Sequence, residues 1–214
     1  MNILVTGLNG EPVLANFQVG TANSKTGDGV QIFLIPWRWI ETGEIGDDAA
    51  NCGDCPFAGG NGCYVRKGTA NWGLHSKVRS LARRYKFGRL FINEAEDVIG
   101  ICRGKYVRFG AYGEAVLLGE SLVRKIVAVC DGWTGYTHQI KRYPWASEFF
   151  MVSSERAYQG VGREFLVIDR DQPAPDKGIM CPASKEAGHK LTCRKCLLCR
   201  GTSTGAKNIF IYQH

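Results

Sequence analysis

The sequence of 214 residues contains no long uninterrupted apolar run. A helix that crosses a bilayer needs about 20 apolar residues in succession, so we expect no membrane-spanning segment and no membrane partner. The first residues, Met1 to Gly7, also lack the basic start and the cleavage site of a secretory signal peptide. These absences predict a cytoplasmic protein.

Acidic residues are missing from one long stretch, between Arg66 and Arg89. The stretch carries eight basic residues with Trp72, Tyr85 and Phe87 interleaved: Arg66, Lys67, Lys77, Arg79, Arg83, Arg84, Lys86 and Arg89. Phosphates attract such cations and bases stack on such rings. The stretch therefore predicts binding of a nucleic acid or nucleotide, and the candidate contacts are Arg79, Arg83, Arg84 and Lys86.

The same stretch has a second interpretation, as the solvated face of a helix. Ser76 can cap a helix that continues to about Lys86. Its inward residues at helical spacing would be Val78, Leu81, Ala82 and Tyr85. A second basic surface is expected near the end of the chain, at Lys185, Lys190, Arg194, Lys195, Arg200 and Lys207.

Cysteine, in contrast, is plentiful. Four of the nine cysteines lie close together near the end of the sequence: Cys181, Cys193, Cys196 and Cys199. Short C-x2-C steps bring thiolates together, which suits a tetrahedral zinc ion or an iron–sulfur cluster. A structural zinc knuckle and a cluster both remain open, and a reducing cytosol favours either over disulfides.

A second group of cysteines, Cys52, Cys55 and Cys63, offers only three ligands. Three protein ligands leave one position for water, substrate or a cofactor. The alternative is a zinc site completed by a distant histidine, such as His75. Cys102 and Cys130 stand alone in apolar runs, and we expect both to be buried thiols.

The composition, 44% apolar and 22% charged, is that of a globular protein. The patterns predict a helix over 121–129 and strands over 2–6, 13–19, 31–35, 105–109, 133–137, 149–152 and 164–168. Strands that alternate with helices indicate an α/β fold with a parallel sheet, either open or as a partial (βα) barrel. We expect an α/β core over residues 1–175, with a Cys-rich metal-binding segment over 176–214 packed on it.

Chemistry in a parallel sheet gathers where strands end at their carboxyl side. Glu114 and His138 follow two of the predicted strands and are the candidate catalytic residues; the alternatives are a helix cap for Glu114 and an ordinary hydrogen-bonded role for His138. Further strand ends hold Gly110, Gly113, Thr137, Ser153, Ser154, Glu155, Asp169 and Arg170. The polar turn over 21–27, with Lys25, is a weaker phosphate-binding candidate because it lacks the Walker spacing.

Several of these segments together resemble a family of bacteriophage proteins: 108–114 (RFGAYGE), 135–138 (GYTH), 23–27 (NSKTG) and the cysteines of 52–64. That family in turn resembles shortened radical S-adenosylmethionine enzymes. The resemblance implies a [4Fe–4S] cluster with one open iron on Cys52, Cys55 and Cys63, although C-x2-C-x7-C replaces the usual C-x3-C-x2-C. It implies that Gly113 and Glu114 bind the amino group of S-adenosylmethionine, and that the four C-terminal cysteines hold an auxiliary cluster.

The preferred function is thus an iron–sulfur, radical-S-adenosylmethionine-like enzyme that modifies a nucleotide or nucleic acid, with His138 facing the substrate. One alternative is a non-catalytic, metal-stapled phage protein that binds nucleic acid or a host protein. Another is a zinc-containing base-exchange enzyme resembling transglycosylases. A phage origin would place the protein in the host cell cytoplasm.

Overall fold

The computed structural model describes residues 1–20, 25–60, 63–66, 68–155, 157–188, 191–204 and 207–213. The strands are β1 (Asn2–Thr6), β2 (Pro12–Val19), β3 (Val30–Pro36), β4 (Tyr106–Tyr112), β5 (Gly132–Thr134), β6 (Tyr136–Thr137), β7 (Met151–Glu155), β8 (Glu164–Ile168), β9 (Ile179–Met180) and β10 (Ile209–Tyr212). The α-helices are α1 (Trp37–Thr42), α2 (Ala49–Cys52), α3 (Gly68–Lys86), α4 (Ala95–Cys102), α5 (Glu120–Val129) and α6 (Cys193–Cys196). Short 3-10 helices are η1 (Ala58–Gly60), η2 (Tyr64–Arg66), η3 (Ala115–Leu118), η4 (Pro144–Glu148) and η5 (Gly201–Thr204).

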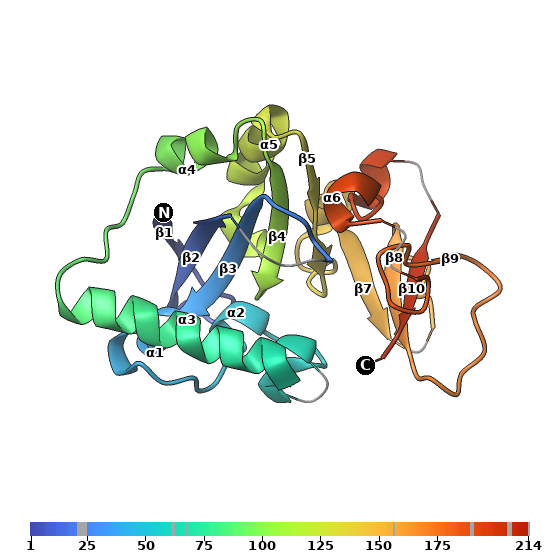
Figure 1. Cartoon of the computed structure of the whole chain (residues 1–214), viewed down its shortest axis with the longest axis horizontal. Coiled ribbons are helices and arrows are strands. Elements are labelled where there is room, and N and C mark those ends of the chain that lie inside the picture. The colour runs from blue at the N-terminus through green and yellow to red at the C-terminus, as the bar shows by residue number, and fades with distance from the viewer. Residues whose placement is uncertain are drawn as a thin grey trace.

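The first sheet has the order β1-β2-β3-β4-β5 and is covered by helices on both faces (Figure 1). Successive side chains of a strand point to opposite faces. Val13 and Ala15 of β2 accordingly pack in the cluster that includes α4 and α5, and Leu14 packs in the one that includes α1 and α3. Burying a side chain the size of Val13 or Leu14 stabilises the fold by about 1.5–3 kcal/mol.

The second sheet has the order β6-β7-β8-β10-β9, and all its pairs are parallel. Only Gly135 separates β5 from β6, and its carbonyl accepts a hydrogen bond of 3.1 Å from the Met151 amide. A Cβ on Gly135 would lie 2.6 Å from Cδ1 of Phe150, so this crossing point requires glycine. The chain thus passes from one sheet to the next along a nearly continuous strand.

The mixed α/β fold with parallel strands is confirmed, in an open form. Parallel pairing runs through β3, β4 and β5, whereas β1, β2 and β3 pair antiparallel. Both sheets are open along the described part of the chain, and a barrel is not confirmed. The C-terminal Cys-rich segment contributes β9 and β10 to the second sheet, so it is part of the sheet as well as a cover for it.

Two local expectations were wrong. Helix α3 begins at Gly68 rather than at Ser76, so Ser76 lies within the helix and does not cap it. Tyr85, expected to face inward, is 42% exposed, because at the end of α3 it meets only the edge of the Trp37 ring, with centroids 5.2 Å apart. Val78 and Leu81 are buried as expected.

The strand predicted over 149–152 is also displaced. Phe149 and Phe150 belong to the turn that follows η4, where both amides bond to the Ala146 carbonyl, and β7 begins at Met151. Ser153 and Ser154 therefore lie within the strand, with Glu155 as its last residue, and not beyond its end. No helix in the described ranges has the length and apolar character needed to cross a membrane.

Candidate functional site

The three-cysteine loop lies after β3, at the carboxyl end of the parallel strands. Cys52 ends α2, and the Cys55 amide bonds back to the Cys52 carbonyl at 3.2 Å. Between them Gly53 has φ 59° and ψ −129°, a conformation that favours glycine. A Cβ there would also lie 2.6 Å from Cδ1 of Leu8, so the loop packs tightly on the β1–β2 turn.

Asp48, which sequence reasoning missed, anchors this loop. Its buried carboxylate accepts hydrogen bonds from the Gly59 amide at 3.1 Å, from Arg66 Nη1 at 3.2 Å and from the Tyr112 hydroxyl at 3.2 Å. Gly59 lies between the second and third cysteines, Arg66 follows the third, and Tyr112 ends β4. One carboxylate thus joins both sides of the cysteine loop to the sheet. Arg66, the first residue of the basic stretch, forms part of this internal contact with Asp48.

Glu114 and His138 meet at the same end of the sheet, as the strand-end argument predicted. The Glu114 carboxylate accepts hydrogen bonds from the Thr137 hydroxyl at 2.7 Å and from the His138 amide at 3.1 Å, and it lies 3.1 Å from His138 Nδ1. The other ring nitrogen, Nε2, lies 3.8 Å from the Cys55 sulfur. Glu114 stands at the N-cap of η3, but its side chain makes no capping bond there.

The electrostatics of this group are those of buried thiols beside a paired imidazole. Burial raises the pKa of Cys52 far above its usual range, and the charges of Asp48 and Cys55 raise it further. Burial also raises the pKa of Cys63. Burial lowers the pKa of His138, but hydrogen bonds to Cys55 and Glu114 raise it more, to about 10.

No group of three His, Cys, Asp or Glu side chains in the described ranges has the arrangement of a metal site. The charges of Cys55 and Cys63 nevertheless raise the pKa of Cys52, so the three thiols share one electrostatic neighbourhood. The histidine beside this group is His138, and not His75 as the zinc alternative suggested. Metal binding by these three thiols stays a prediction.

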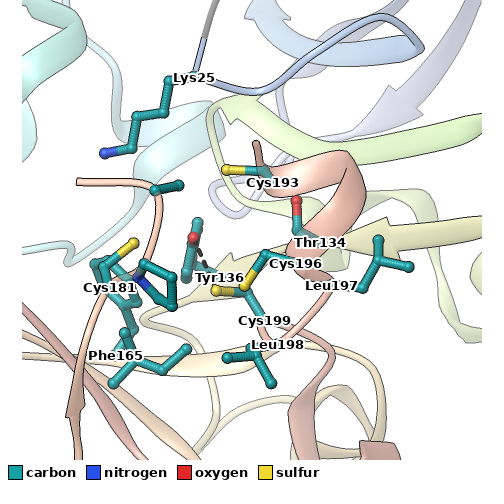
Figure 2. Close-up of a pocket in the computed structure, with 13 residues that line it drawn as sticks. Lys25, Thr134, Tyr136, Phe165, Cys181, Cys193, Cys196, Leu197, Leu198 and Cys199 are labelled. Carbon is teal, nitrogen blue, oxygen red and sulfur yellow. Dashed lines mark hydrogen bonds between the residues drawn. The ribbon is translucent and has the colours of Figure 1, made fainter. Parts of the chain in front are cut away.

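The four C-terminal cysteines line one small cavity of about 30 Å³ (Figure 2). Cys181 follows β9, Cys193 and Cys196 bound α6, and Cys199 comes three residues later. Leu197, at φ 52°, is the only described non-glycine residue with positive φ, and it turns the chain between Cys196 and Cys199. The sequence expectation that these thiols converge is met, and their metal remains a prediction.

Polar groups surround this four-cysteine cavity. The Tyr136 hydroxyl donates to the Cys199 sulfur at 3.2 Å, and burial raises the pKa of Cys199 to about 12. Burial raises the pKa of Cys193, while the positive charges of Arg108 and Lys25 oppose that rise. Two cations beside four thiols would partly balance the negative charge of a tetrathiolate metal centre.

Backbone hydrogen bonds fasten the four-cysteine segment to distant parts of the chain. The amides of Cys193 and Arg194 donate to the carbonyls of Lys25 and Thr26 at 2.8 and 3.1 Å. The polar turn considered for phosphate binding is thus held against the cysteines at its end, while residues 21–24 lie outside the described ranges.

A buried arginine, Arg163, holds the same segment from the sheet side. It donates to the carbonyls of Leu198, Gly201 and Lys207 at 2.7, 2.8 and 2.6 Å. Its position before β8 gave no sequence signal, because its partners lie 35 to 44 residues away.

A larger cavity of about 400 Å³ adjoins His138, and sequence reasoning missed it. Its lining comes from three separate segments of the chain: Leu8, Asn9, Ala49, Gly53, Asp54, His138, Gln139, Lys141 and Arg142. A space of this size beside a cluster of potential ligands is typical of a small-molecule site.

The basic side chains of α3 are exposed, as both interpretations of that stretch require. Arg79, Arg83, Arg84 and Lys86 all face solvent. Trp72 is 79% and Phe87 64% exposed, so rings and cations share this side of the helix. We call the surface formed by Arg79, Arg83, Arg84 and Lys86 the α3 basic surface. Its binding of nucleic acid stays a prediction.

The remaining candidates are structural or solvent-exposed. Cys102 is fully buried, as expected, and burial raises its pKa to about 12, whereas Cys130 is only half-buried against the same core. Asp169 and Arg170 follow β8, but both are exposed and bond to Gln172 and Gln213.

Comparison with protein-family models, with curated proteins and with solved structures gives no match for this chain.

Proposed function

We propose that this protein is an iron–sulfur enzyme of radical-S-adenosylmethionine-like type that acts on a nucleotide or nucleic acid. One observation carries the proposal: His138 lies 3.8 Å from the Cys55 sulfur and 3.1 Å from the Glu114 carboxylate at the carboxyl end of the parallel strands, beside a cavity of about 400 Å³. Cys52 and Cys63 belong to the same loop, and the charges of Cys55 and Cys63 raise the pKa of Cys52. Catalytic groups of parallel α/β folds gather at this end.

The strand order supports the proposal. Strands β3, β4 and β5 of the first sheet and β6, β7 and β8 of the second are neighbours in chain order and pair in parallel, and β10 pairs in parallel with β8 while β9 lies at the edge. A partial (βα) barrel has this order, in which each strand delivers its following loop to a common rim. Here the loop after β3 carries the cysteines, the loop after β4 carries Glu114, and the loop after β6 carries His138.

The donor types suit a cluster, although the three side chains are not arranged as a metal site within the described ranges. One of the thiols is buried and two are half-buried, and the Phe57 ring contacts that of His138 with centroids 5.8 Å apart. When bound, the cluster would supply the electron for reductive cleavage of S-adenosylmethionine. Partial burial would limit access of water and oxidants to it.

Glu114 has a more local role than the resemblance implied. Its carboxylate already accepts bonds from Thr137 and His138, so we assign it the orientation of His138. The Gly113–Glu114 turn remains the proposed contact for the cofactor amino group, because the Glu114 amide bonds to the Asn51 carbonyl at 2.7 Å and so places the turn beside the cysteine loop.

A second candidate is a non-catalytic, zinc-stapled binding protein, and the position of His138 favours it. A histidine that ligates a metal through one ring nitrogen usually donates the other to a carboxylate. His138 has this arrangement, with Nε2 toward Cys55 and Nδ1 toward Glu114. Three thiolates and this imidazole would close a tetrahedral zinc site.

Cofactor cleavage separates the two candidates. Reduced, anaerobically purified protein should convert S-adenosylmethionine to 5′-deoxyadenosine, and Cys55→Ala should abolish the product. Cys130→Ser, a change outside both cysteine groups, should leave turnover intact. Protein with full iron and sulfide that forms no 5′-deoxyadenosine would contradict the enzyme proposal and favour a non-catalytic, metal-stapled binding protein, whereas zinc without sulfide would favour the zinc-stapled candidate.

A further inference from the structure

The cavity beside His138 carries a combination of groups that the metal chemistry does not require. Lys141 and Arg142 lie on its wall, and neither forms an ion pair within the described residues. The single carboxylate on the wall, Asp54, accepts a hydrogen bond from Gln139 Nε2. Two cations against one acid make this wall attractive to an anion.

The cavity is also held in shape by bonds between its three segments. Arg142 Nη1 donates to the Leu8 carbonyl at 2.9 Å, and the Leu8 amide donates to the Ala50 carbonyl at 2.8 Å. The Gln139 carbonyl accepts bonds from the amides of Arg142 and Tyr143 at 3.1 and 2.9 Å, which fixes the turn that carries Lys141. Because the wall is ordered before the ligand binds, binding does not lose the conformational entropy of ordering it, and this favours higher affinity.

Uncharged hydrogen-bonding groups lie on the same wall. Asn9 and Gln139 present amide groups, and Gln139 is only 6% exposed. Amides on a cavity wall recognise the donor and acceptor edges of a polar ring system. A volume of about 400 Å³ accommodates a ligand the size of a single nucleotide.

We propose that this cavity binds a mononucleotide-sized ligand through its phosphate, with Lys141 and Arg142 holding the phosphate and the Asp54–Gln139 pair and Asn9 facing the base. The inference rests on the proposed function in one respect, since it names the substrate class of the site at His138. Binding itself requires no turnover.

The test is isothermal titration calorimetry with adenosine and guanosine 5′-monophosphates, with adenosine and with inorganic phosphate, at low salt. Both monophosphates should bind saturably, more tightly than adenosine or phosphate. Lys141→Ala should weaken monophosphate binding by about tenfold or more, because it removes a charge-assisted contact. The matched control is Lys125→Ala on α5. Lys141 and Lys125 are both exposed, so we expect both variants to fold normally.

Equal affinity of wild type and Lys141→Ala would overturn the proposal, as would binding of oligonucleotides but of no mononucleotide. The monophosphates are titrated into protein as purified and into chelator-treated protein, so that their affinity is measured with and without metal. This comparison separates ligand binding from the metal-dependent activity of the proposed function. Lys141-dependent binding by protein that cleaves no S-adenosylmethionine would sustain the ligand site while removing the radical chemistry.

Discussion

Glu114 and His138 are joined at two points, since one carboxylate lies 3.1 Å from both the backbone amide and the ring Nδ1 of the histidine. The ring therefore has little freedom to rotate, and its Nε2 stays directed at Cys55. A fixed imidazole is the state in which a histidine can ligate a metal or face a substrate.

Glu114→Gln tests this relationship. The amide keeps the size of the side chain but loses its charge, so we expect an unchanged fold. The second candidate, in which His138 ligates zinc, predicts a loss of zinc affinity at the three-cysteine site of about 10- to 100-fold. Competition with a chromophoric chelator measures it. Glu120→Gln, whose carboxylate pairs with Arg124 on the surface, is the control. Equal metal retention by both variants would remove the orienting role of Glu114.

Cys196→Ser tests the four-cysteine site. If the four thiols share one metal centre, the variant should release its metal, because metal binding and local folding are coupled. Hydrogen exchange should then rise at Cys193 and Arg194, whose amides bond to Lys25 and Thr26, and the melting temperature should fall. Cys130→Ser should change neither. Unaltered metal content and exchange in Cys196→Ser would contradict a shared site.

The α3 basic surface is tested by the double change of Arg83 and Arg84 to alanine. Both side chains are exposed, so the variant should fold normally and bind single-stranded oligonucleotides more weakly. The slope of log affinity against log salt should become shallower by about 1 to 2, since each phosphate contact releases counterions. The control is the double change of Arg103 and Lys177 to alanine, which removes two positive charges outside α3. Salt-independent binding, or none at low salt, would return the surface to a solvated helix face.

Lys77 provides a pH-dependent test away from the cysteines. Burial lowers the pKa of its ammonium to about 8; the group lies 4.0 Å from the centre of the Phe33 ring and bonds to Asn16 and Gln18. The unfolded chain then binds the proton more tightly than the folded one, so this group's contribution to stability rises as pH increases from about 8 toward 10.5, the ordinary pKa of a lysine side chain.

Lys77→Met removes that titration while retaining an unbranched side chain. Urea unfolding across this pH window should show the wild type gaining stability relative to the variant as pH rises. A difference in unfolding free energy that stays constant with pH would mean that the Lys77 ammonium is not destabilised by burial.

Local pattern accounts for what the sequence predicted well. Strands β1 and β8 match their predicted ranges, because alternating or continuous apolar residues define them without help from distant segments. The meeting of Glu114 and His138 followed from strand ends, since β5 pairs in parallel with β4 and continues past Gly135 into β6. The four C-terminal cysteines converge because most of them are close in sequence.

What sequence did not predict depends on contacts between distant segments. Asp48 reaches Arg66 and Tyr112, 18 and 64 residues away, and no local pattern marks it as an anchor. The neighbour of Cys55 is His138, 83 residues distant, while the closer His75 was the natural guess. The cavity at His138 is assembled from three segments, so no single one of them carries its signal.

The central claim, a cluster on Cys52, Cys55 and Cys63, is tested most directly by measuring iron, acid-labile sulfide and zinc in anaerobically purified wild type, Cys55→Ala and Cys196→Ser. The account predicts brown protein with iron and sulfide, a loss of about one cluster in Cys55→Ala, and retention of that cluster in Cys196→Ser. Colourless wild-type protein with zinc and no sulfide, and with Cys55→Ala losing zinc, would contradict it.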